Sequence, residues 1–130
     1  LFPNVREVLD TLYNRGCVLT IASSRLSESL MLFMREHKID GYFSYVVGSD
    51  SVTKHKPDAE PVLQTLRELG VVASEVMVVG DMPVDILMAR NAGARNVGVT
   101  WGNASREELE AACADHIIDN IEQLLTLVAE

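Results

Sequence analysis

Residues 76–93 read VMVVGDMPVDILMARNAG, and this stretch decides the fold. A run of four apolar residues ends in the pair Gly80-Asp81, and helical spacing follows up to Asn91, with Gly93 as a plausible C-cap. The pattern predicts a buried strand that leads directly into a helix. A second aspartate, Asp85, follows Asp81 by four residues, where the helix begins. Two carboxylates at this junction either cap the helix or hold a charged group.

The same alternation runs along the whole chain, which predicts one α/β domain over residues 1–130. Near-continuous apolar runs predict strands at 17–22, 42–50, 76–81, 96–102 and 116–119. Helical patterns cover 4–16, 26–39, 57–70, 82–91, 106–114 and 120–130. Asn4 is the expected N-cap of the first helix, Pro57 the start of the third, and Gly70 its end. The expected architecture is a doubly wound, Rossmann-like parallel sheet with helices on both faces.

The composition is that of an ordinary globular domain without disulfides. Of 130 residues, 48% are hydrophobic, and 19 acidic against 11 basic residues give a formal charge of −8 at pH 7. This balance argues against nucleic acid or an anionic membrane as a partner. No apolar run approaches the roughly 20 residues of a membrane span, and no signal-peptide pattern occurs. Cys17 and Cys113 lie in apolar segments without metal-ligand spacing, so we expect reduced core thiols and a cytoplasmic protein.

Polar residues collect after the predicted strands, at the sheet edge where parallel α/β proteins gather their chemistry. They are Ser23, Ser24, Arg25, Lys56, Asp81 and Asp85. A hydroxyl, an ammonium and two carboxylates suit a phosphate held together with Mg²⁺. Taken singly, each has an ordinary alternative. Asp81 can be an N-cap, Lys56 a surface lysine, Ser23 the end of a strand, and Arg25 the solvated start of a helix.

In this order and over essentially the whole chain, these residues resemble the motifs of the haloacid dehalogenase-like hydrolase superfamily. Ser23 in IASSR stands at the second-motif Ser/Thr, which hydrogen-bonds the transferring phosphoryl group. Lys56 in KHKPDAEPVL stands at the third-motif lysine, which steadies the phosphate and the nucleophile. Asp81 and Asp85 in GDMPVDILMARNAGA match the fourth motif, whose acids hold Mg²⁺ directly or through water. The segments KHKPDAEP and VGVTWG are most similar to the phosphoglycolate-phosphatase-like branch.

The resemblance also implies a part that this sequence does not contain. The family's first motif, DxDxT, supplies the nucleophilic aspartate on the opening strand, and no such string occurs here. The opening LFPNVREVLDTL is similar to the point where the core resumes after the helical cap domain. We therefore expect a core without its first strand and cap. Its two inner strand edges, at the strands before Ser23 and Asp81, should be paired by other residues of the protein, by a second chain, or by each other.

The resulting expectation is a Mg²⁺-dependent phosphatase for a small phosphorylated metabolite, which works through an aspartyl-phosphate whose aspartate lies outside this chain. The 130-residue chain alone should be inactive. A phosphomutase of the same superfamily and a non-catalytic core module remain alternatives. A response-regulator receiver domain is disfavoured because its acids precede its lysine, and a haloalkanoate dehalogenase because it needs no metal. The oligomeric state stays open.

Overall fold

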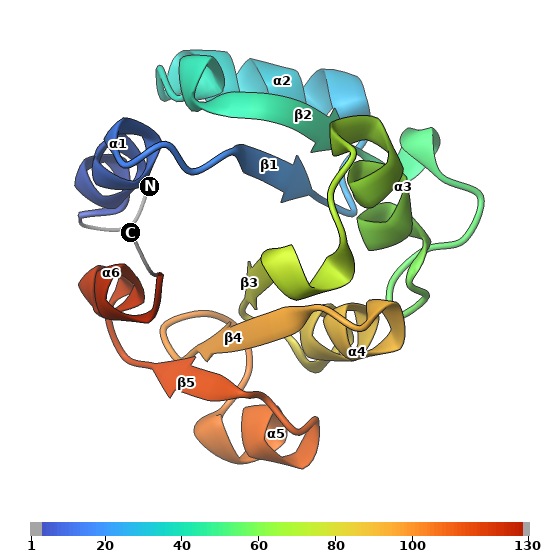
Figure 1. The fold of residues 1–130 in the computed structure, drawn as a ribbon, viewed down its shortest axis with the longest axis vertical. Coiled ribbons are helices and arrows are strands. Elements are labelled where there is room, and N and C mark those ends of the chain that lie inside the picture. The colour runs from blue at the N-terminus through green and yellow to red at the C-terminus, as the bar shows by residue number, and fades with distance from the viewer. Residues whose placement is uncertain (1–3, 129–130) are drawn as a thin grey trace. The chain divides into compact units, whose positions relative to one another are not determined.

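The computed structural model describes residues 4–128, which divide into two compact units. The first contains the residues up to Val52 together with those from Ile121 onward, and the second runs from Thr53 to Asn120. Their α-helices and β-strands are labelled in Figure 1. Among the described residues, no helix is long and apolar enough to cross a membrane.

The first unit holds a two-stranded parallel sheet and the helices around it. Its elements are α1 (Val5–Asn14), β1 (Leu19–Ala22), α2 (Ser27–Glu36), η1 (Asp40–Tyr42), β2 (Phe43–Val47), η2 (Ser49–Ser51), η4 (Ile121–Gln123) and α6 (Leu124–Leu127). Strands β1 and β2 pair in parallel with Ala22 beside Val47. Leu30 and Met34 of α2 form the core of this unit with Ile39. The C-terminal elements belong here because η4 and α6 pack against α1.

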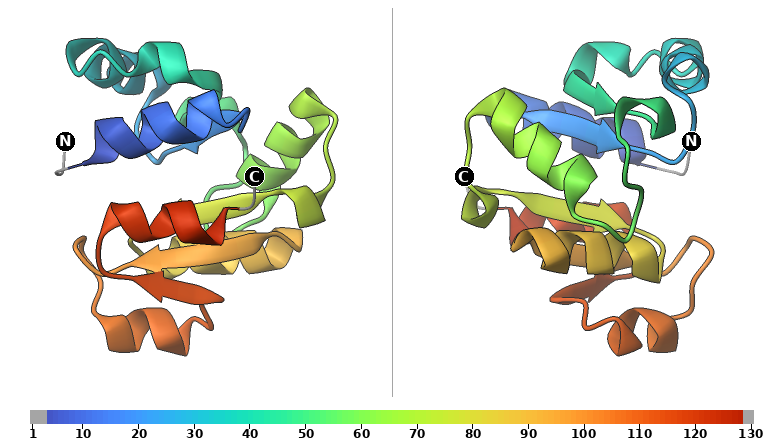
Figure 2. Two further views of the ribbon diagram at one scale, coloured as in Figure 1. Left: turned by 60° about the vertical axis from the view of Figure 1, so that its left-hand side comes forward. Right: turned by 90° about the vertical axis from the view of Figure 1, so that its right-hand side faces the viewer.

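The second unit holds a three-stranded parallel sheet covered by helices, as Figure 2 shows. Its elements are α3 (Glu60–Leu69), η3 (Ala73–Glu75), β3 (Met77–Gly80), α4 (Pro83–Ala92), β4 (Arg95–Val99), α5 (Arg106–Ala111) and β5 (His116–Ile118). Helix α4 packs on β3 and β4 and also contacts α3 and α5. Ile86 of α4 and Leu109 of α5, both fully buried, form one of its hydrophobic cores.

Several local expectations are confirmed. All five predicted strands form, each shorter than its apolar run, and the order of elements is α/β throughout. Gly70 and Gly93 end α3 and α4 in the left-handed conformation, with φ of 66° and 76°. Asn4 is the N-cap of α1, but its side chain makes no capping bond and its Nδ2 donates to Oε1 of Glu122, 2.7 Å away.

Other expectations are wrong. Helix α3 begins at Glu60 with Pro61 in its first turn, three residues after Pro57, because residues 53–59 are held as an irregular segment by bonds that the helical pattern does not reveal. Cys17 and Cys113 are free thiols as expected, but Cys113 is exposed. It follows α5 in the left-handed conformation, at the turn into β5. Up to residue 128, the closing helix expected at 120–130 is a 3-10 turn followed by the short α6, and its last two residues lie outside the described residues.

The predicted single sheet is two sheets within residues 4–128. Strand β1 pairs with β2 alone, and β3 pairs with β4 alone. These two strands are the ones expected to flank the absent first strand, and each ends its own sheet. Pairing of these edges with each other, by other residues of the protein or by a second chain stays a prediction.

Candidate functional site

The β3–α4 junction brings together two of the predicted site residues, Lys56 and Asp85. The ammonium Nζ of Lys56 lies 2.6 Å from Oδ1 of Asp85, and only 16% and 11% of the two side chains are exposed. Oδ2 of the same carboxylate accepts a hydrogen bond from the Met82 backbone N–H at 3.3 Å. Asp85 therefore holds a lysine and also satisfies the N–H of Met82, the N-cap residue of α4.

Gly80 permits this arrangement because the carboxylate lies directly against the end of β3. A Cβ at Gly80 would stand 2.6 Å from Cγ and from Oδ2 of Asp85. No side chain fits in that space. The Gly-Asp pair noticed in the sequence thus has a steric cause, in which the glycine makes room for the second aspartate.

Asp81 is not the helix cap that the simpler interpretation suggested. The N-cap of α4 is Met82, whose side chain makes no capping bond, and Asp81 precedes it. Oδ2 of Asp81 instead accepts the Asn103 backbone N–H at 3.3 Å, from the loop after β4. Gly102 in that loop packs so closely that a Cβ there would lie 2.7 Å from Cγ of Asp81. Of the two carboxylates, Asp85 caps the helix and Asp81 has an oxygen, Oδ1, without a bond in the described chain.

In the first unit, Ser23, Ser24 and Arg25 form the turn after β1. The Ser23 N–H donates to the Val47 carbonyl at 2.9 Å, which extends the β1–β2 pairing to the site residue. Its hydroxyl oxygen accepts the Arg25 N–H at 3.1 Å, so the hydroxyl proton remains available to a ligand. The Arg25 guanidinium lies 5.0 Å above the ring of Phe33 in α2, a cation–π contact.

An aspartate that the sequence analysis did not single out fixes this turn from the β2 side. Oδ1 of Asp50 accepts both the backbone N–H and the hydroxyl of Ser27, at 2.8 and 2.7 Å. These two hydrogen bonds lower the pKa of Asp50 below its ordinary value. Asp50, which lies in η2 after β2, thereby caps the start of α2 from a distant element. An aspartate just after the second strand was the signal that could have drawn attention to it.

The two sets of residues belong to different units. Lys56, Asp81 and Asp85 lie in the second, and Ser23, Ser24 and Arg25 lie in the first. Their convergence on one ligand stays a prediction. Within residues 4–128, no three His, Cys, Asp or Glu side chains gather as a ready-made metal cage.

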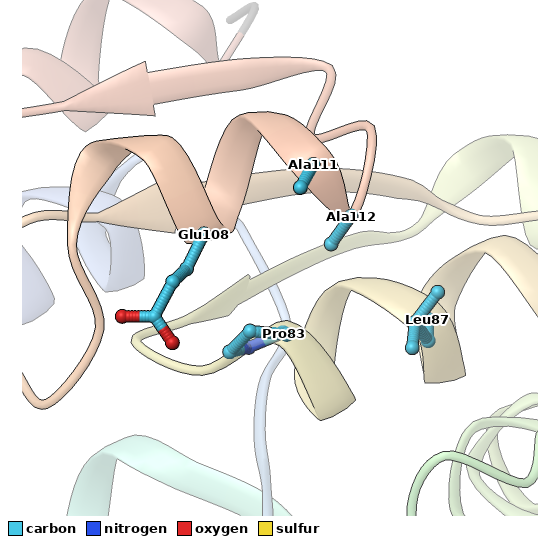
Figure 3. A pocket seen from close by; sticks show the side chains of 5 residues that line it. All are labelled: Pro83, Leu87, Glu108, Ala111 and Ala112. Carbon is cyan, nitrogen blue, oxygen red and sulfur yellow. The ribbon is translucent and has the colours of Figure 1, made fainter.

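An open hollow of about 360 Å³ lies between α4 and α5. Figure 3 shows its lining, which is Pro83, Leu87, Glu108, Ala111 and Ala112. Glu108 accepts the Ser105 N–H at 3.1 Å and so caps α5. The hollow has no cationic lining residue and contains none of the predicted site residues.

The motif residues and the α/β order agree with a family-level match. Residues 1–99 match the model of the haloacid dehalogenase-like hydrolase family. The chain belongs to this family, as its three ordered motifs indicated.

Curated relatives carry phosphatase names. The chain is 33% identical to a phosphoglycolate phosphatase of Vibrio parahaemolyticus over 129 residues, which are 99% of this chain and 57% of that protein. It is 30% identical to the pyrophosphatase PpaX of Oceanobacillus iheyensis, over 99% of this chain and 60% of that protein. The chain thus spans little more than half the length of these relatives.

A solved structure with the same fold is a HAD-superfamily hydrolase of subfamily IA, variant 1, from Geobacter sulfurreducens PCA. It is 30% identical and superimposes with a TM-score of 0.84 over 98% of this chain and 61% of that one. The α/β fold with parallel sheets is therefore that of the haloacid dehalogenase-like hydrolases.

Proposed function

We propose that this chain is the core of a Mg²⁺-dependent phosphatase that hydrolyses a small phosphorylated metabolite. The observation that carries the proposal is the largely buried Lys56–Asp85 pair beyond the carboxyl end of β3, where Asp85 lies in the first turn of α4, four residues after Asp81. A lysine ammonium has three N–H donors, and the bond to Asp85 uses one. Two donors remain for phosphoryl oxygens. The phosphatase and pyrophosphatase names of the relatives support the same chemistry.

The donor set suits Mg²⁺. This ion prefers oxygen ligands and is usually bound through one or two carboxylates, with waters and substrate phosphate completing its shell. Asp81 offers a carboxylate whose Oδ1 has no bond within the described chain, while both oxygens of Asp85 already accept a bond. Asp81 is therefore the proposed direct ligand, and Asp85 the one that acts through water. When bound, Mg²⁺ offsets the negative charge of the phosphoryl oxygens.

The chain's own residues have separate tasks in this proposal. Ser23 donates its hydroxyl proton to a phosphoryl oxygen, and Ser24 and Arg25 are further phosphate ligands. Lys56 offsets the charge of the phosphoryl group and of the attacking carboxylate. The nucleophile is an aspartate outside this chain; the ester oxygen leaves as the aspartyl-phosphate forms, and water then cleaves the acyl phosphate. The substrate is small and phosphorylated, and neither nucleic acid nor a membrane is a partner.

Metal titration of the full-length protein tests the ligand assignment. Asp81→Asn keeps the shape and removes an anionic ligand, so turnover at limiting Mg²⁺ should fall by orders of magnitude. Asp85→Asn should lower turnover less. Asp40→Asn, at an exposed position in η1 of the first unit, is the matched control and should leave turnover unchanged. Wild-type activity of Asp81→Asn at low Mg²⁺ would refute the assignment.

A second experiment separates the enzyme from a non-catalytic module and from a mutase. Hydrolysis of p-nitrophenyl phosphate is measured for the 130-residue chain and for a version extended through an upstream strand with the DxDxT motif. We expect activity only in the extended version. Equal rates in both would show that the nucleophile lies within this chain. With a sugar phosphate as the substrate, transfer of phosphate between sugar carbons without net release of phosphate would instead identify a phosphomutase.

A further inference from the structure

The segment that carries Lys56, residues 53–59, has no regular secondary structure but is held from both of its ends. The first residues of the segment are held by Glu60, which follows the segment in the chain and whose carboxylate folds back over it. The Thr53 N–H donates to Oε1 at 3.1 Å, the Thr53 hydroxyl to Oε2 at 3.1 Å, and the Lys54 N–H to Oε2 at 2.7 Å. These bonds, the Thr53 N–H foremost, lower the pKa of Glu60 below its ordinary value. One carboxylate at the start of α3 thus fixes two consecutive residues.

On the downstream side, Asn91 holds the residue next to Lys56. Its Nδ2 donates to the Pro57 carbonyl oxygen at 2.9 Å. Asn91 lies in the last turn of α4, the helix whose first turn carries Asp85. The segment is therefore tied to one helix at two successive residues, through the Lys56 side chain and through the Pro57 backbone.

We propose that Glu60 and Asn91 are positioning residues that set the place of the Lys56 ammonium for the phosphoryl group. A lysine has a long flexible stem, so its charge is localised only when its backbone is fixed at the base. Asp85 fixes the tip, while Glu60 and Asn91 fix the base on both sides. The inference rests on the proposed function, in which this ammonium faces phosphate.

Two near-isosteric substitutions test the inference in the full-length protein. Asn91→Asp replaces the donated bond by a carboxylate facing the Pro57 carbonyl, and Glu60→Gln turns an acceptor oxygen into an amide that faces N–H donors. Each should lower kcat about three- to tenfold, less than the roughly hundredfold cost of a 1 Å displacement. KM should change less. Glu68→Gln is the matched control, since this glutamate is exposed on the same helix as Glu60.

A merely structural role is excluded by repeating the substitutions in a Lys56→Met background. If Asn91 and Glu60 act through Lys56, Asn91→Asp and Glu60→Gln should change kcat by no more than about twofold in this background. They should also change the dissociation constant of inorganic phosphate, measured by calorimetry, by no more than about twofold. An undiminished effect in the Lys56→Met background would overturn the inference, because the two residues would then act on the fold rather than on the ammonium.

The positioning inference and the proposed function can fail separately. If Lys56→Met keeps wild-type kcat, the proposed role of Lys56 in phosphate binding is wrong. Whether Asn91 positions the Lys56 side chain is then tested by urea unfolding. The coupling between Lys56→Met and Asp85→Asn is measured with and without Asn91→Asp. A coupling that falls to less than about half supports positioning, and an unchanged coupling refutes it.

Discussion

Loss of the Lys56 ammonium should destabilise the chain as well as impair phosphate binding. Lys56→Met keeps most of the stem and deletes the charge that lies 2.6 Å from Oδ1 of Asp85. Asp85 is 8% exposed, and its remaining bond is a single backbone N–H at 3.3 Å. Removing one partner of a fully buried ion pair costs about 3–5 kcal/mol. Because both side chains retain some exposure, we expect a loss of about 2–3 kcal/mol.

The assay is urea unfolding of the 130-residue chain followed by circular dichroism. Lys54→Met is the control, since that side chain is exposed and it should cost less than about 0.5 kcal/mol. The double variant Lys56→Met with Asp85→Asn removes the buried charge altogether. It should be more stable, by about 1–2 kcal/mol, than the sum of the single losses predicts. Equal losses for Lys56→Met and Lys54→Met, or simple additivity in the double variant, would refute the buried pair.

Three further outcomes follow from the second unit. Gly102→Ala places a methyl group 2.7 Å from Cγ of Asp81. It should lower the free energy of unfolding by about 1–3 kcal/mol and weaken Mg²⁺-dependent turnover. Gly41→Ala, with nothing within 4 Å, should change neither quantity. The pKa of Glu60 lies below its ordinary value of 4.5, so its stabilising contribution is present above that pH and disappears as the pH falls through the lowered pKa. The difference in unfolding free energy between wild type and Glu60→Gln should therefore shrink on acidification, and a difference that grows would contradict the hydrogen bonds. Leu109→Ala empties a fully buried position against Gly98. It should lower the free energy of unfolding, measured by heat or urea, by about 2–5 kcal/mol. This loss should be several times that of Leu63→Ala, at a site that is 39% exposed.

Local pattern was sufficient for the order of the elements. Apolar runs placed every strand, and Gly70 and Gly93 ended their helices where left-handed backbone is needed. The same pattern placed Asp81 and Asp85 at the end of β3, because a strand's end can be read from its own residues. It misplaced the start of α3, since Pro57 and Pro61 give the same local signal and the bonds that hold residues 53–59 are not local.

What each polar group contacts was decided by the tertiary structure. The sequence offered Asp81 as a possible N-cap of the helix, whereas in the fold Asp85 caps it and Asp81 holds the loop after β4. Lys56 lies 29 residues from Asp85, Asn103 lies 22 residues from Asp81, and Ser27 lies 23 residues from Asp50 in the chain. The division into two sheets was likewise decided by which strands pair in the folded chain. The periodicity of apolar residues along the chain indicates which positions are buried, because burial depends largely on whether a residue's own side chain is apolar. A long-range hydrogen bond depends on which distant group the folded chain brings within hydrogen-bond distance, and composition carries no record of that.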